Sequence, residues 1–245
     1  MHNNYVIFSK WFFQMNSIEI IEALKSLGDS KNREGMARFG INTQNALGIP
    51  MPELRRMAKS IKTNHELALS LWSSGLHEAR ILSVLIADPK QLTLELASEW
   101  CGDFDSWDLC DQACMNLFDK ADWARQAITI WAEDEREYVR RAAFALIASI
   151  GVHHKKASDE SFEEFFELIS KHSHDGRNFV KKAINWALRQ IGKRNPELNR
   201  RAINFCESLL EEKQDASTKW IAKSALRELT SENLRIRSIK KLSNE

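Results

Sequence analysis

The stretch KKAINWALRQIGKRNP, residues 181–196, has the periodicity of an amphipathic helix. With about 100° between successive residues, one face collects the apolar side chains: Ala183, Ile184, Ala187, Leu188 and Ile191. Trp186 points nearly the opposite way. The other side chains on its face are basic: Lys182, Arg189 and Lys193. Because tryptophan is usually mostly buried, Trp186 needs a partner there, either a groove of a neighbouring helix or another molecule.

Similar helical patterns fill the 245-residue chain, which has only 9 Gly and 4 Pro. We find no run with the alternation of a β-strand, so the sequence predicts an all-α protein. The stretch MARFG, which begins at residue 36, is predicted to open a loop that leads to a helix with Pro52 in its first turn. Further helices are predicted at 17–28, 65–75, 77–88, 90–101, 106–119, 121–132, 135–150, 160–171, 177–192, 197–212, 216–230 and 232–242.

Many short helices with tight connections favour antiparallel helix pairs stacked side by side, as in the α-solenoids of HEAT and armadillo repeats. No fixed sequence period is visible, so the repeats are degenerate, and an irregular helical bundle is the alternative. The segment SFEE at residues 161–164 has the spacing of a capping box. We predict an N-terminal extension at 1–14 that need not be ordered, and a single HEAT-like domain at 15–245.

Composition excludes several kinds of protein. No stretch is long and apolar enough for a membrane helix, and residues 1–14 lack the pattern of a signal peptide. The four cysteines do not follow a zinc motif, and Cys110 and Cys114 fall on an apolar stripe, which is typical of reduced thiols in a cytoplasmic protein. The histidine pairs 153–154 and 172/174 lack an ordered ligand set. We therefore expect a monomer without metal or other cofactor.

A second helix, REYVRRAAFALIASIG at residues 136–151, places one arginine opposite its apolar stripe. Arg141 has the small side chains of Ala145 and Ala148 beside it, so another molecule could approach it closely. A guanidinium suits the geometry of phosphate. The alternative is an ordinary ion pair with Glu137, one turn away.

A third helix, DFDSWDLCDQACMNLF at residues 103–118, places Trp107 and Asp111 one turn apart on the flank of its stripe. An indole and a carboxylate in this arrangement can contact one ligand. The alternative is a half-buried tryptophan beside a solvated aspartate. Ser106 or Asp105 is expected to cap this helix.

The net charge is +1, which gives little indication of a polyanionic partner. Residues 177–201, however, hold eight basic residues and one acid. Such a run is either a solvated face or a surface for nucleic acid.

Together, the segments SWDLCD, YVRRAAF, FVKKAINWALRQIGKRNPE and MARFGI…LGI resemble the HEAT-like repeat DNA alkylation repair enzymes, the AlkD-type alkylpurine DNA glycosylases. The resemblance covers about residues 17–230. It implies that Trp107, Asp111 and Trp186 are catalytic, with Trp186 facing a deoxyribose, and that Arg141 contacts phosphate. Phe39 takes the place of a tyrosine that some members carry.

The resemblance implies that the chain hydrolyses the N-glycosidic bond of cationic N3- or N7-alkylated purines, such as 3-methyladenine and 7-methylguanine, in double-stranded DNA. The site residues would share a concave, basic face, with Phe39, Lys182, Arg189 and Lys193 as further DNA contacts. One alternative is a non-catalytic HEAT-repeat protein that binds distorted or branched DNA. Another is a protein–protein scaffold, which would have an apolar or acidic groove instead.

Overall fold

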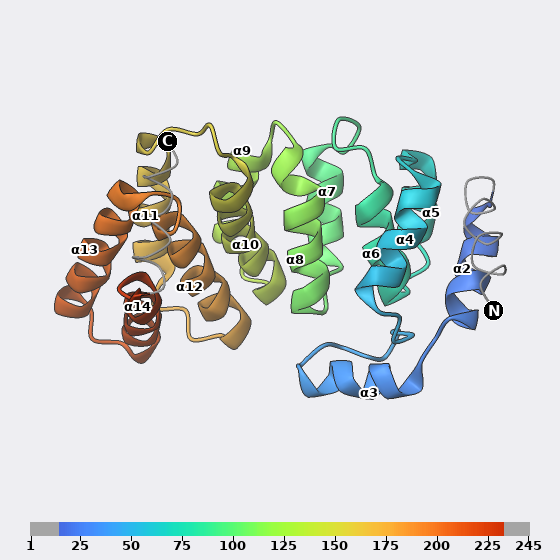
Figure 1. The fold of residues 1–245 in the computed structure, drawn as a ribbon, viewed down its shortest axis with the longest axis horizontal. Coiled ribbons are helices and arrows are strands. Elements are labelled where there is room, and N and C mark those ends of the chain that lie inside the picture. The colour runs from blue at the N-terminus through green and yellow to red at the C-terminus, as the bar shows by residue number, and fades with distance from the viewer. Residues whose placement is uncertain (1–14, 233–245) are drawn as a thin grey trace. The chain divides into compact units, whose positions relative to one another are not determined.

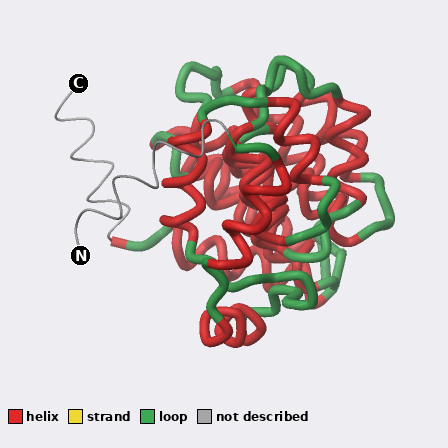
Figure 2. Tube along the Cα trace, turned by 90° about the vertical axis from the view of Figure 1, so that its right-hand side faces the viewer, coloured by secondary structure: helices red, strands yellow, loops and turns green. Residues whose placement is uncertain are grey.

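The computed structural model describes residues 15–232, and every regular element in that range is helical (Figures 1 and 2). The α-helices are α2 (Ser17–Ser26), α3 (Ser30–Arg38), α4 (Met51–Ile61), α5 (His65–Trp72), α6 (His77–Ile86), α7 (Leu94–Gly102), α8 (Trp107–Asn116), α9 (Ala124–Ala132), α10 (Glu137–His153), α11 (Glu163–His172), α12 (Asn178–Gly192), α13 (Pro196–Glu212) and α14 (Ala216–Leu229). Short 3₁₀ helices lie at Phe118–Lys120 and Glu160–Phe162. Within this range no helix has the length and apolar character needed to cross a membrane.

The chain divides into two compact units, unit 1 (Met1–Trp123) and unit 2 (Ala124–Glu245). In unit 1, α6 packs against α4, α5 and α8. The stacked rings of Trp72 and Trp100, with centroids 4.0 Å apart, join α5 to α7. Helix α3 lies crosswise to these helices (Figure 1) and has no buried residue.

In unit 2, α10 packs against α9 and α12, and α12 packs against α13 and α14. The stripe predicted for α12 is confirmed, because its five apolar residues are fully buried. Helix α10 differs, since its residues from 141 to 151 are buried on all faces. A helix that is apolar all round is expected to be enclosed by neighbours.

The helices α6, α8, α10, α12 and α14 begin at residues 77, 107, 137, 178 and 216. Their spacing is therefore about 30 residues at first and about 40 later, and only the later value is close to the usual length of a HEAT repeat. This change of spacing explains why the sequence shows no fixed period.

The sequence-based prediction of helices is confirmed from residue 65 to residue 230, with differences of a few residues at the ends. The prediction of a loop at residue 36 was wrong, because α3 continues to Arg38. It has no apolar stripe and begins with the carboxylate of Asp29 accepting from the backbone N–H of Asn32, 3.0 Å away. The predictions for 1–14 and 233–242 lie outside the described residues.

Two predicted caps were also wrong. Ser161 lies in a 3₁₀ helix, where its hydroxyl donates to Ser158 O and accepts from Arg125, and α11 has no side-chain cap. Ser106 does precede α8, but its hydroxyl accepts from the backbone N–H of Asn42 at 2.9 Å instead of capping the helix. Both hydroxyls bind a segment distant in sequence, which a local motif cannot indicate.

Candidate nucleic-acid interface

Trp107 is the first residue of α8 and is half-exposed, as the sequence predicted. Its indole Nε1 donates a hydrogen bond to the carbonyl oxygen of Phe39 at 3.0 Å. The ring of Phe39, at the end of α3, is 74% exposed. The structure therefore brings together two of the predicted site residues that lie 68 positions apart in the chain.

A cavity of about 750 Å³ lies beside Trp107, entirely within unit 1. Its lining combines apolar and polar side chains from α3, α4, α6, α8 and the connection between α3 and α4, including Met36, Phe39, Ile49, His77, Trp107 and Asp108. Helix α3 forms one wall of the cavity. Because α3 has no buried residue, its position depends on the segments that flank it.

Glu78 holds the connection between α3 and α4. Its carboxylate is fully buried and accepts from three successive backbone N–H groups, those of Leu47, Gly48 and Ile49, at 2.8, 2.7 and 3.2 Å. Gly48 has φ +84°, and a Cβ there would lie 2.2 Å from Asp29 O. Only glycine fits this position, so the connection has one well-defined path beneath α3.

Next to Trp107, Asp108 binds the buried His77, with 2.9 Å between Oδ2 and Nε2. Burial alone would lower the pKa of His77, but the hydrogen bond and charge of Asp108 outweigh it and raise the pKa above its ordinary value. The sequence-based reasoning missed this pair. The only available signal was a carboxylate adjacent to the candidate tryptophan.

Asp111 follows Trp107 by one turn of α8 and is also half-exposed. The opposite face of α8 is buried and contains Cys110 and Cys114, which form no disulfide, as predicted. Burial raises the pKa of the Cys114 thiol well above its usual value. A neutral, enclosed thiol is a poor nucleophile, so the reactive groups that α8 presents at the surface are the indole and the carboxylate.

Arg141 does not occupy the exposed position that we predicted for it. It is only 5% exposed, and its Nη1 donates to the carbonyl oxygen of Phe179 at 2.7 Å. Glu137 accepts from the backbone N–H of the same residue at 3.2 Å. The prediction failed because the side of α10 opposite its stripe is also enclosed. Glu137 and Arg141 together hold the first turn of α12.

Trp186 is half-exposed on α12, as its position off the apolar stripe predicted. With the side-chain amide of Gln190 oriented to accept, the indole Nε1 lies 2.9 Å from its oxygen. The two predicted DNA-binding cations on the same helix, Arg189 and Lys193, both bind Glu228 of α14. Burial opposes ionisation of Glu228, but the two cations outweigh it and lower the pKa of that carboxyl.

Most of the basic run at residues 177–201 is engaged in contacts within unit 2. Arg177 binds Asp175, while Arg200 and Arg201 lower the pKa of Glu197 to about 2. Arg194 donates to the carbonyls of Gly151, His154 and Ala157. Lys181 and Lys182 have no carboxylate partner within residues 15–232, and Lys182 is exposed.

A family model described as "DNA alkylation repair enzyme" matches residues 20–229. The chain belongs to this family. The match spans both units and includes all the candidate residues. No curated protein matches the sequence.

The fold of this DNA alkylation repair family member is shared with a solved structure. The two chains are 20% identical, with a TM-score of 0.72, over 87% of this chain and 95% of the other. That protein is described as belonging to "a new family of proteins related to the HEAT-like repeat DNA glycosylases with affinity for branched DNA structures". At this identity the likeness shows the HEAT-like fold alone.

The candidate residues of the family member fall into two sets. Unit 1 carries Phe39, Trp107 and Asp111, and unit 2 carries Arg141, Trp186 and the basic residues of α12. Within residues 15–232, no cluster of three or more His, Cys, Asp or Glu side chains is arranged to hold a metal ion. A single concave, basic face shared by both sets stays a prediction.

Proposed function

We propose that the chain is a DNA glycosylase that excises cationic N3- and N7-alkylated purines from double-stranded DNA. The observation that carries the proposal is the placement of Trp107 and Asp111, one turn apart on α8 and both half-exposed. Membership of the DNA alkylation repair family supports it. A half-exposed indole beside a carboxylate is suited to a reaction in which positive charge develops on a sugar.

The chemistry needs few protein groups because the substrate is already activated. A purine alkylated at N3 or N7 carries a positive charge, so it leaves as a neutral base without a general acid. The C1′–N bond breaks with its electron pair going to the base, and the sugar becomes an oxocarbenium-like cation. Water then attacks C1′ and loses a proton, which leaves an abasic site.

Each proposed site residue then has a distinct role. Asp111 stabilises the sugar cation electrostatically and orients or deprotonates the attacking water. Trp107 stabilises the same positive charge through cation–π attraction, and Trp186 packs against the deoxyribose. Phe39 is held beside Trp107 by the bond to its carbonyl, and its exposed ring would contact the DNA next to the lesion.

The second candidate function is recognition of branched or distorted DNA without catalysis. One observation favours it: the similar solved structure is described by its affinity for branched DNA. A binder of this kind would not need the carboxylate of Asp111.

Release of alkylated base from methylated duplex DNA tests the proposal directly. We expect 3-methyladenine and 7-methylguanine to be released by the wild-type protein, and no base to be released from undamaged DNA. If the wild-type protein binds DNA but releases no alkylated base, the glycosylase proposal is wrong and the binding function replaces it.

The Asp111→Asn variant tests the mechanism, because it keeps the size of the side chain and removes its charge. With enzyme in excess, we expect the single-turnover rate to fall by roughly 100-fold or more, the scale of one preorganised electrostatic group. Binding should stay the same or improve, since a carboxylate repels phosphates. Asp122→Asn, at an exposed position of the same unit, is the matched control. An unchanged rate in Asp111→Asn would contradict the role of the carboxylate.

A further inference from the structure

Helices α12 and α14 of unit 2 share one register. Five of the eight buried residues of α12 have a buried counterpart 38 positions later in α14. The pairs are Val180 and Thr218, Ala183 and Ile221, Ile184 and Ala222, Ala187 and Ala225, and Ile191 and Leu229. The two helices therefore turn equivalent faces inward. Residues at equivalent positions outside the stripe lie on equivalent faces of the two helices.

The fifth residue of α12 is Lys182, and the fifth residue of α14 is Trp220. Lys182 is a candidate DNA-contacting residue, which we selected from the sequence. Trp220 was not selected, although it occupies the corresponding position in the last repeat. Helix α14 therefore places an aromatic side chain where α12 places a candidate DNA-binding lysine.

Trp220 differs from the other tryptophans of the described chain. It is 40% exposed, and no other tryptophan within residues 15–232 reaches that exposure. Trp72, Trp107 and Trp123 donate their indole N–H to protein oxygens. The N–H of Trp220 has no acceptor in the same part of the chain. This indole is left available for a ligand.

Cations surround Trp220. The ammonium of Lys181 lies 5.0 Å from the centre of the indole ring. Lys182 is exposed in the next position of α12, and Lys223 is exposed one turn beyond Trp220 on α14. None of these lysines has a carboxylate partner in residues 15–232, whereas Arg189 and Lys193 further along α12 are neutralised by Glu228. The positive charge is therefore retained around the exposed ring.

We propose that Trp220, with Lys181 and Lys182, is a binding subsite for an unpaired nucleotide of DNA. The indole stacks on an unstacked base, and the lysines bind the flanking phosphates. Base–aromatic stacking combined with a positive surface is the usual mode of binding to single strands. In an intact duplex the base faces are covered by their neighbours, so only DNA with an unpaired segment offers this surface. The proposal rests on the DNA-binding part of the proposed function.

The test compares two DNA ligands, a forked duplex with unpaired arms and a fully paired duplex of the same length. Trp220→Ala is expected to weaken binding to the fork by about tenfold, within the range for loss of one stacked base. Binding to the paired duplex should change by less than about twofold. Trp220→Phe keeps an aromatic face and should retain most of the affinity for the fork. Ile130→Ala removes an apolar side chain that is 51% exposed on α9 and is the matched control.

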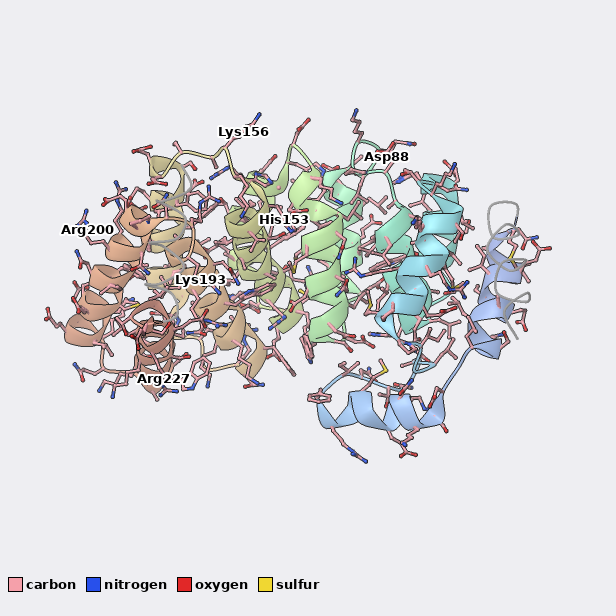
Figure 3. All side chains as sticks on the ribbon, in the orientation of Figure 1. Asp88, His153, Lys156, Lys193, Arg200 and Arg227 are labelled. Atoms are coloured by element: carbon pink, nitrogen blue, oxygen red, sulfur yellow. The ribbon has the colours of Figure 1, made fainter. Side chains whose placement is uncertain are left out.

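The charge of the subsite is tested through the salt dependence of binding to the fork. Lys182→Gln should reduce the slope of log K against log[salt] by about 0.7, the value for one phosphate contact on a single strand. Lys156→Gln is the charge-matched control. Figure 3 shows Lys156 on the connection after α10, at the end of unit 2 away from Arg227 of α14.

The outcomes separate this inference from the proposed function. If the wild-type protein binds the fork and Trp220→Ala binds it equally well, the subsite is wrong while the glycosylase proposal stands. Equal weakening on both ligands would also overturn it, because the ring would then contact the backbone and not a base. If the wild-type protein binds neither ligand, both the subsite and the proposed function fail.

Discussion

Helix α12 of unit 2 and helix α3 of unit 1 are held in place in different ways. In unit 2, buried polar side chains tie the start of one helix to its neighbours. Asp175 accepts from Arg140 and Arg177, and Ser217 donates to the carbonyl of Asp175 at 2.7 Å. In unit 1, α3 contributes no buried residue and forms a wall of a cavity of about 750 Å³.

This difference predicts which helices are rigid and which open more readily. Regions with few buried contacts open with a lower free energy than the core around them. We therefore expect α3 to be the first helix of unit 1 to open. Trp107 is bonded to the segment that ends α3, so the candidate catalytic residues lie next to the most adaptable part of their unit. Helix α12, which carries Trp186, is bonded at its start to Arg141 and Glu137 of α10.

Among the variants proposed here, Asp175→Asn should have the largest effect, which is a loss of stability in unit 2. It breaks a buried pair and leaves two arginines without their charge partner, which costs about 3 kcal/mol or more. Burial opposes ionisation of Asp175, but Arg177 and Arg140 outweigh it and hold the pKa of this carboxyl far below its usual range. Its contribution is therefore present above the ordinary pKa and is lost as the pH falls. Hydrogen exchange at neutral pH should show loss of protection in unit 2 and not in unit 1.

Asp134→Asn is the matched control, because Asp134 makes the same bonds to the residue two positions later, Arg136. Asp134 is 25% exposed, compared with 5% for Asp175. We expect a loss of less than about 1 kcal/mol, as for a solvated pair. Equal losses in the two variants would show that burial does not strengthen the pairing of Asp175.

Arg141→Ala comes next. It removes a charged donor and leaves the carbonyl of Phe179 without this bond, for a loss of about 2 kcal/mol in the stability of unit 2. Lys182→Ala, at the same position in the next repeat but exposed, should change stability by less than about 0.5 kcal/mol. Thermal unfolding followed by circular dichroism measures both. If Arg141→Ala leaves stability unchanged but weakens DNA binding, Arg141 is a phosphate contact after all.

Gly48→Ala should affect unit 1 locally. The added Cβ meets both an unfavourable φ and the carbonyl oxygen of Asp29, so we expect a loss of roughly 2 kcal/mol in the opening free energy of α3. Gly75→Ala is the control, because Gly75 has φ +70° with open space around it. It should show only the backbone penalty, about 1 kcal/mol. If exchange of the α3 amides is the same in both variants, this helix does not depend on the Gly48 turn.

The sequence predicted the helices that carry an apolar stripe, because burial of the stripe stabilises them. For α12, the stripe predicted the helix, its buried face and the half-exposed position of Trp186. Helix α3 has no stripe and is fixed by its cap and by the neighbouring turn at Gly48, so its pattern resembles that of a loop. Periodicity detects helices that pack, and it misses helices held only at their ends.

The sequence predicted only those features of the site that depend on a single helix. Trp107 and Asp111 are one turn apart on one helix, so their common half-exposed side followed from the spacing. The burial of Arg141 and the pairing of Arg189 with Glu228 depend on residues 38 and 39 positions away. Contacts between repeats decide which cations are free, and the sequence of one helix contains no information about them.

The smallest expected effect is a pH dependence of stability that has opposite signs in the two units. Asp108 raises the pKa of His77 in unit 1, whereas burial lowers the pKa of His172 in unit 2 despite its hydrogen bond to Glu133. The His77 contribution is fully present below the ordinary pKa of 6.5 and is lost as the pH rises through the raised value. The neutral His172 gives the opposite sign, with stability present above 6.5 and lost as the pH falls through the lowered value. As the pH rises from about 5 to 8, hydrogen exchange should show unit 1 losing stability and unit 2 gaining stability. His77→Gln and His172→Gln should each flatten only the slope of their own unit. Parallel slopes in the wild-type units would contradict the opposite electrostatic environments of the two histidines.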